Sequence, residues 1–151
     1  MSQTCKLSFR SPRMSQIPKK SGANWGEANA HVNPGDSYIP IRQDNLKAAP
    51  YLFPTVESGR VTIDVTWDDG ERMRCSFEAT QDFNGAVYPK QIASDGDKSI
   101  LGDYLRKRMG VSSGKPISDN DFERYGRDDI DITKNDDGTF FFDFSVPPKT
   151  P

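Results

Sequence analysis

The sequence is poor in the residue types from which catalytic and metal sites are built. It contains one histidine, His31, and two cysteines, Cys5 and Cys75, among 151 residues. A single histidine excludes a histidine pair within this chain, either for zinc or for acid–base catalysis. Two cysteines form no disulfide framework, so we expect both to be reduced packing residues of an intracellular protein.

Other signals are missing as well. No stretch approaches the ~20 apolar residues that a membrane helix requires. The first ten residues, MSQTCKLSFR, lack the apolar core of a signal peptide. No glycine-rich nucleotide loop follows a strand and opens a helix. We therefore expect no membrane segment, no metal, no cofactor and no catalytic activity of the chain's own.

The composition is typical of a folded domain, with 34% hydrophobic and 28% charged residues. We expect one domain over residues 1–151, with 147–151 as a flexible tail. The net charge is −2, but residues 1–60 hold 8 basic and 4 acidic residues, and the remainder holds 12 and 18. A basic first part can gather on one face, so the net charge does not exclude a nucleic-acid partner.

Alternation of apolar and polar residues predicts two hairpins. Residues 61–67 alternate strictly, Asp69-Gly70 favours a tight turn, and the return strand over 71–79 buries Met73, Cys75 and Phe77 and exposes Arg72, Arg74 and Ser76. Residues 129–133 and 139–146 form the second hairpin. One face of it carries Phe140, Phe142, Phe144 and Val146, and Phe141 points the other way.

Shorter elements complete the skeleton. Residues 6–9 and 38–41 read as short strands, and 42–54 has room for one helical turn before Pro50. Ser99 can cap a helix that ends at Gly110, and a capping box at Ser118 opens another that ends at Gly126. The sequence thus predicts a mainly β domain with six or seven strands and two short α-helices.

Two long polar segments interrupt this skeleton, at residues 10–36 and 81–98. Neither has a helical or alternating period, so we expect both to be irregular, and long irregular segments in compact domains are usually functional or disordered. Both are rich in side chains that donate and accept hydrogen bonds. Asn and Gln suit adenine edges, while Arg and Lys suit guanine edges or phosphates. Two such arms on a β scaffold could grip one duplex.

Several blocks of the sequence, in order, resemble one known family. They are SPRMSQIPKKSGANWGEANAHVNPGDSYIPI, WDDGERM, NGAVYPKQI, LGDYLRKRMGV, DFERYGRDDI and DGTFFFDFSV. Together they are similar to the DNA-recognition (effector) domain of type II restriction endonucleases that carry a phospholipase D-like nuclease. That domain is related to the plant B-three DNA-binding domain. The resemblance covers residues 6–146 and departs from the usual pattern at Ala23 and Glu27.

The resemblance implies a seven-stranded open pseudobarrel with two short α-helices. It implies two arms in the major groove of double-stranded DNA, the first at residues 13–33 and the second at 81–94. His31 lacks the lysine two residues on that a phospholipase D-like nuclease requires, so cleavage would belong to a nuclease domain outside this chain. We accordingly expect a non-catalytic recognition domain, monomeric in isolation, of a bacterial cytoplasmic enzyme.

The expected DNA-contacting residues come from both arms. They are Arg13, Lys19, Lys20, Ser21, Asn24, Trp25, Gly26, Asn29, His31, Asn33, Gln81, Asp82, Asn84, Tyr88, Lys90, Gln91 and Ser94. We expect the Trp25 ring to pack at the base of the first arm and hold its shape. Asn24 and Lys20 would then reach the DNA, because a preshaped arm loses less entropy on binding.

Each assignment has a structural alternative. His31 could be an ordinary loop residue, Lys19-Lys20 a solvated charge pair, and Asn84-Gly85 no more than a turn. We read the basic residues 106–108 as compensation of a helix dipole rather than as a DNA contact. The paired aspartates at 68–69 and 136–137 lie beside hairpin glycines, so turn chemistry explains them better than metal binding.

Three functions remain open from the sequence. The first is sequence-specific binding of duplex DNA. The second is binding of single-stranded nucleic acid, which requires aromatic rings exposed on strands, with Phe141 as a candidate. The third is a protein-interaction or ligand-binding barrel with no nucleic-acid role, which the acidic second part permits. Salt dependence separates the third from the others, and duplex preference separates the first from the second.

Overall fold

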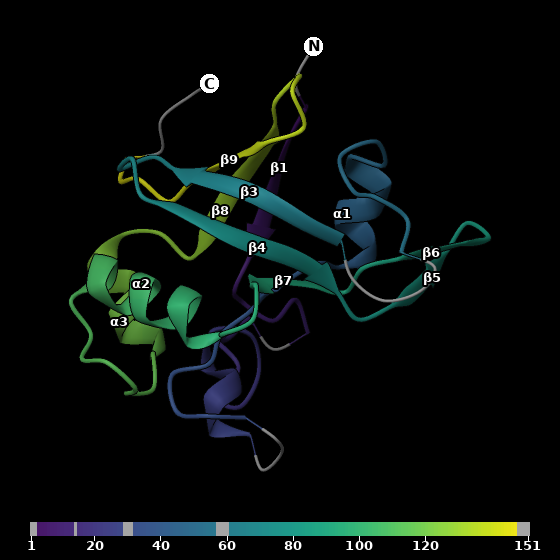
Figure 1. The fold of residues 1–151 in the computed structure, drawn as a ribbon. Helices are drawn as coiled ribbons and strands as arrows, with labels where there is room; N and C mark the ends of the chain where they lie inside the picture. Colours follow the sequence, from purple (N-terminus) through teal and green to yellow (C-terminus); the bar gives the residue numbers. More distant parts are fainter. Residues whose placement is uncertain (1–2, 14, 29–31, 57–60, 148–151) are drawn as a thin grey trace.

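The computed structural model describes residues 3–13, 15–28, 32–56 and 61–147. Its seven-stranded sheet is accompanied by a two-stranded hairpin, three α-helices and one 3-10 helix (Figure 1). The strands of the sheet are β1 (Gln3–Ser8), β2 (Ile39–Pro40), β3 (Val61–Trp67), β4 (Arg72–Glu78), β7 (Gln91–Ser94), β8 (Asp129–Lys134) and β9 (Phe140–Asp143). The separate hairpin is β5 (Gln81–Phe83) and β6 (Ala86–Tyr88). The helices are η1 (Gly22–Glu27), α1 (Gln43–Ala48), α2 (Ser99–Met109) and α3 (Asp119–Tyr125).

The sheet nearly closes on itself. Its strand order is β1-β8-β9-β3-β4-β7-β2, with every pair antiparallel except β3 and β9. The two edge strands, β1 and β2, approach each other across the opening. There the Arg42 guanidinium donates a hydrogen bond to the Ser8 carbonyl oxygen at 2.6 Å. The result is the open pseudobarrel that the sequence leads us to expect, because closure hides most of the strand edges from solvent.

The inward side chains of the strands form the core. Leu7, Phe77, Ile92, Ile132 and Phe142 are fully buried. Strand β3 has the predicted bounds, and it pairs with β4 around the Asp69-Gly70 turn. Such alternation is reliable because side chains on a strand point to opposite faces with a period of two.

Two details of the hairpin predictions are wrong. Ser76 is fully buried rather than exposed, and its hydroxyl is satisfied there because it donates to the Glu78 carboxylate at 2.7 Å. Val146 is 47% exposed, because strand β9 ends at Asp143 and the alternation stops there. Phe140, Phe142 and Phe144 are buried as predicted.

The predicted helices α2 and α3 lie together at one end of the sheet (Figure 1). Gly110 ends α2 in the left-handed conformation, with a φ of 74°. At the start of α3 the Ser118 hydroxyl accepts from the Asp121 N–H, and the Asp121 carboxylate accepts from the Ser118 N–H. The N-cap of α2 is Lys98 rather than Ser99, whose N–H and hydroxyl donate to Asp97.

The second polar segment is not irregular. It contains the hairpin β5–β6 and then the sheet strand β7. Asn84 and Gly85 form the two-residue turn of the hairpin, with φ angles of 49° and 76°. Positive φ at both turn positions matches the right-handed twist of a hairpin, and Asn-Gly is the dipeptide that adopts it most readily. Within the described part of the chain, no helix has the length and apolar character needed to cross a membrane.

Acidic residues of the second part are paired on β8 and β9. The Arg127 guanidinium is buried and contacts Asp129 at 2.8 Å, Asp131 at 2.7 Å and Asp143 at 3.5 Å. Lys6 on β1 contacts Asp129 and Asp131 from the neighbouring strand. These three carboxylates therefore support the sheet and lie on strands that carry neither arm.

Candidate nucleic-acid interface

The two arms leave the barrel at neighbouring places. The first arm connects β1 to β2 and contains η1, and the hairpin β5–β6 of the second arm extends beyond the sheet (Figure 1). A hollow of about 440 Å³ lies between their roots. Residues 13, 18, 21 and 22 line it from the first arm, and residues 90 and 91 line it from the second. Residues 11, 12 and 79, which precede the two arms in the sequence, also line it. We call this feature the inter-arm hollow.

The inter-arm hollow is basic. Arg13, Arg42 and Lys90 line it, and no Asp or Glu is among the described residues of its wall. Arg13 and Lys90 are exposed and form no ion pair with another described residue. Burial lowers the pKa of Arg42, but the guanidinium of an arginine stays charged at neutral pH. Three cations without a matching carboxylate suit contact with phosphates.

A buried amide anchors the first arm. Asn24 is 2% exposed, and its Nδ2 donates to the carbonyl oxygens of Pro18 at 2.9 Å and Ile117 at 2.7 Å. Its Oδ1 accepts from the Ile117 N–H at 2.7 Å. Both amide hydrogens are therefore used inside the protein. This overturns the expectation that Asn24 reaches the DNA, because no polar group of its side chain is left at the surface.

A buried arginine holds the same region. The Arg106 side chain donates to the carbonyl oxygens of Lys115 at 2.6 Å, Gly35 at 3.2 Å and Gly102 at 3.0 Å. Burial lowers its pKa, and it is 1% exposed. Helix α2 approaches so closely that a Cβ on Gly102 would lie 1.7 Å from the Gly35 oxygen. The interpretation of residues 106–108 as dipole compensation therefore misses the role of Arg106.

Trp25 packs at the base of the first arm. Its ring meets Tyr38 edge to face, with centroids 5.2 Å apart, and the Lys98 ammonium lies 5.7 Å from the ring centroid. This packing is consistent with the expected anchoring role. Gly26 is fixed by its surroundings, because a Cβ there would lie 2.5 Å from the Asn33 oxygen. The described part of the first arm is therefore well packed, and its polar sequence does not predict this packing.

Internal bonds also fix the second arm. The Gln81 amide donates to the carbonyl oxygens of Ile41 at 3.0 Å and Pro89 at 2.8 Å, which ties the hairpin to the end of β2. The Tyr88 ring packs against Phe83, with centroids 6.0 Å apart. Ser94 is 1% exposed, and its hydroxyl donates to the Asp97 oxygen and accepts from the Leu101 N–H. Ser94 therefore supports the entry to α2 and is not available to DNA.

A carboxylate at the end of β4 contacts the second arm and a lysine that lies over Trp25 of the first arm. The Gln91 Nε2 donates to Glu78 Oε1 at 3.2 Å, and the Lys98 ammonium contacts the same oxygen at 2.8 Å. Burial alone would raise the pKa of Glu78, but hydrogen bonds from Lys98 and Ser76, with the Lys98 charge, hold it below its usual value. Glu78 is a functional candidate that sequence reasoning missed, because a glutamate at a strand end looks like an ordinary solvent-facing residue.

The remaining expected residues lie at the surface or outside the described chain. Arg13, Lys19, Lys20, Asn33, Asp82, Asn84 and Lys90 are exposed, and Ser21 and Gln91 are partly exposed. Asn29 and His31 lie outside the described residues. Arg13, Ser21, Lys90 and Gln91 line the inter-arm hollow. Lys19 and Lys20 line a separate hollow together with Glu27 and Asp119.

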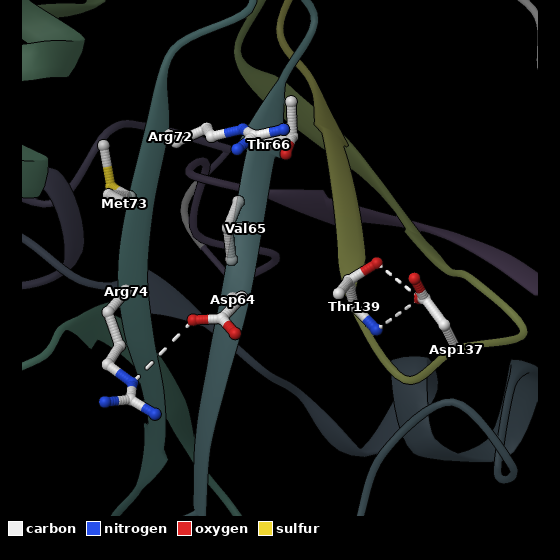
Figure 2. A pocket seen from close by; sticks show the side chains of 8 residues that line it. All are labelled: Asp64, Val65, Thr66, Arg72, Met73, Arg74, Asp137 and Thr139. Carbon is white, nitrogen blue, oxygen red and sulfur yellow. Dashed lines mark hydrogen bonds and ion pairs between the residues drawn. The ribbon is translucent and has the colours of Figure 1, made fainter.

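A second hollow provides a comparison. It lies on strands β3 and β4 beside the turn before β9 (Figure 2). Its two arginines, Arg72 and Arg74, share the wall with Asp64 and Asp137, and Arg74 lies 3.8 Å from Asp64. Carboxylates among the cations make this surface a poorer partner for phosphates than the inter-arm hollow.

Comparison with known proteins identifies the family. A family model described as the NgoFVII C-terminal B3-like DNA-binding domain matches residues 1–136. That range contains both arms, the inter-arm hollow and all strands up to β8. No curated protein matches the sequence significantly. The chain thus belongs to the family of NgoFVII C-terminal B3-like DNA-binding domains, the recognition domains of a class of restriction enzymes.

Proposed function

We propose that this domain binds double-stranded DNA sequence-specifically, with both arms in the major groove, as the target-recognition part of a restriction endonuclease. The observation that carries the proposal is the inter-arm hollow, whose wall holds Arg13, Arg42 and Lys90 and no described carboxylate. A duplex lying along it would meet one arm on each side. The major groove, about 12 Å wide, admits secondary-structure elements and presents a distinct pattern for each base pair.

The contacts divide into two kinds. Arg13, Lys19, Lys20 and Lys90 would contact phosphates and set the position of the duplex. Ser21, Asn33, Asp82, Asn84 and Gln91 would face base edges, because they are the exposed or partly exposed polar members of the two arms. Asn24, Gln81 and Ser94 would act by holding the arms in shape. Trp25 would do the same from the base of the first arm.

The burial of the aromatic side chains on the strands supports a duplex rather than a single strand as the ligand. Binding of single strands uses aromatic rings on which bases stack. Phe77, Phe140 and Phe142 point into the core, and Phe141 is only partly exposed. The most exposed large apolar side chain of the described residues is Tyr51, which lies in a loop after α1. No row of stacking rings follows the strands of the described sheet.

We further propose that a phospholipase D-like nuclease domain of the same enzyme cleaves the DNA. Its only support is the resemblance of the sequence blocks. The present domain would act as a monomer that supplies recognition.

A salt titration with two competitors tests the proposal. Binding of a labelled duplex is measured between low and near-physiological salt, with unlabelled duplex or single strand as competitor. We expect affinity to fall steeply with salt and the duplex to compete far better than the single strand. If the single strand competes as well as the duplex, the domain is a binder of single-stranded nucleic acid. If binding is absent or does not depend on salt, a protein-interaction barrel is favoured.

A further inference from the structure

Gln91 is an amide side chain in the wall of the inter-arm hollow. Gln91 begins β7, opposite Glu78 on β4 and Pro40 on β2. Its neighbour Ile92 is fully buried in the core, so Gln91 points to the outside of the barrel. There it lines the inter-arm hollow next to Lys90.

The hydrogen bond to Glu78 decides how the Gln91 amide is turned. A carboxylate only accepts, so the group that faces Glu78 must be the NH2 end of the amide. That leaves two groups of the amide for another partner: the carbonyl oxygen, Oε1, to which no described residue donates, and the second hydrogen of Nε2. The orientation of the Gln91 amide is thus set by its hydrogen bond to Glu78, because only the NH2 group can donate to a carboxylate.

Glu78 is itself held in place. Its Oε2 accepts from the Ser76 hydroxyl at 2.7 Å, and Lys98 contacts Oε1 at 2.8 Å. The glutamate side chain is 14% exposed. Lys98 in turn lies over the Trp25 ring of the first arm. The carboxylate is therefore held by Ser76, Gln91 and Lys98, and it keeps its charge because its pKa is lowered.

We propose that Glu78 is a specificity-determining positioning residue, which fixes Gln91 so that its carbonyl oxygen is presented to the DNA. This inference rests on the proposed function. The base that faces Gln91 then carries an exocyclic amino group in the major groove, which means adenine or cytosine. Adenine N6 and cytosine N4 donate there, whereas guanine O6 and thymine O4 accept and would oppose the carbonyl oxygen. The second Nε2 hydrogen of Gln91 can in addition donate to adenine N7, which favours adenine of the two.

Site selection with matched variants tests the inference. A randomised duplex pool is selected with the wild-type domain, Glu78→Gln, Gln91→Ala and the control Glu71→Gln. Glu71 is an exposed carboxylate beside the β3–β4 turn, so its variant removes the same charge away from the hollow. Thermal unfolding of each variant checks that the fold is kept.

We expect the wild type and Glu71→Gln to enrich the same site. Glu78→Gln and Gln91→Ala should both relax one and the same position, from adenine or cytosine toward all four bases, by about tenfold or more. The other positions should keep their preferences. A variant that combines Glu78→Gln with Gln91→Ala, selected in the same way, should relax the base preference at that position no further than Gln91→Ala alone, because Glu78 acts through Gln91.

Other outcomes overturn the inference in distinguishable ways. If the wild type enriches a site but Gln91→Ala relaxes a guanine or thymine, the assigned orientation is wrong. If Glu78→Gln weakens the base preference equally at every position of the site, or changes it at none, Glu78 does not position a base-contacting side chain. If the wild type enriches no site, the proposed function fails and this inference fails with it.

Discussion

The side-chain amide of Asn24 and the backbone of Ile117 form a reciprocal pair of hydrogen bonds, each 2.7 Å long. They join the first arm to the loop between α2 and α3, which is 93 residues away in the sequence. A residue that looks like a DNA reader in the sequence thus serves as the arm's anchor. In the proposed binding mode, an arm held in shape in this way would lose less entropy when it binds DNA.

Asn24→Ala should lower stability by roughly 1–3 kcal/mol, because it leaves the buried N–H and carbonyl of Ile117 unpaired. It should also weaken binding to all duplexes alike, since the arm loses its shape rather than a base contact. Urea denaturation and binding to specific and unrelated duplexes provide the measurements. Asn120→Ala, on the exposed side of α3, is the control and should change stability by less than about 0.5 kcal/mol. A stable Asn24→Ala variant that loses discrimination at one base position would contradict the anchoring role.

Gly102→Ala should destabilise the domain by about 1–3 kcal/mol or more, because the new methyl group would lie 1.7 Å from the Gly35 oxygen. The helix would have to move away from the root of the first arm, so DNA binding should weaken as well. Thermal unfolding and duplex binding check both effects. Lys107→Ala, at an exposed position of the same helix, adds an alanine without the clash. Equal unfolding temperatures for the two variants would show that α2 and the arm are not closely packed.

Arg13→Ala and Lys90→Ala should each weaken binding to every duplex and reduce the salt slope of the binding constant by about one. Each variant removes a cation from the wall of the inter-arm hollow. The slope is obtained from binding at several salt concentrations. Arg72→Ala is the matched control, because Arg72 is exposed but lines the hollow of Figure 2. If Arg72→Ala reduces the slope and the other two do not, the DNA lies on the β3–β4 face.

Asp68→Asn should cost about 3 kcal/mol near neutral pH, because it breaks a mostly buried pair with Arg108. Burial alone would raise the pKa of Asp68, but hydrogen bonds from Arg108 and the Phe144 N–H hold it below its ordinary value of 3.8. A lowered folded-state pKa gives stability that is present above the unfolded value and is lost as pH falls through the folded one. The difference between wild type and variant should therefore be full above about pH 5 and shrink as pH falls below about 4. Urea denaturation across this range measures it, and a constant difference would rule out the ionised pair as the cause.

The parts of the fold that follow from short-range pattern are predictable. Strict alternation gives β3 its bounds, and Ser118, Gly110 and Gly126 mark helix ends by local hydrogen bonding and left-handed backbone. Strands β5 and β6 have three residues each, which is too short for an alternating period to stand out from a polar loop. The turn at Asn84-Gly85 was the available signal for that hairpin.

The candidate site is predictable in place but not in residue roles. Two polar segments locate both arms, and the structure brings their roots together around one basic hollow. Whether an amide faces solvent or a buried carbonyl depends on residues far away in the sequence, as with Asn24 and Ile117. Arg106 and Glu78 escape sequence reasoning for the same reason, because their partners come from distant loops and strands.

Selection from a randomised duplex pool at near-physiological salt, followed by sequencing of the retained DNA, tests the central claim most directly. We predict enrichment of one short duplex site, since the exposed polar side chains of the two arms would face fixed base positions. Retention without enrichment, or no retention even at low salt, would contradict sequence-specific recognition by this domain.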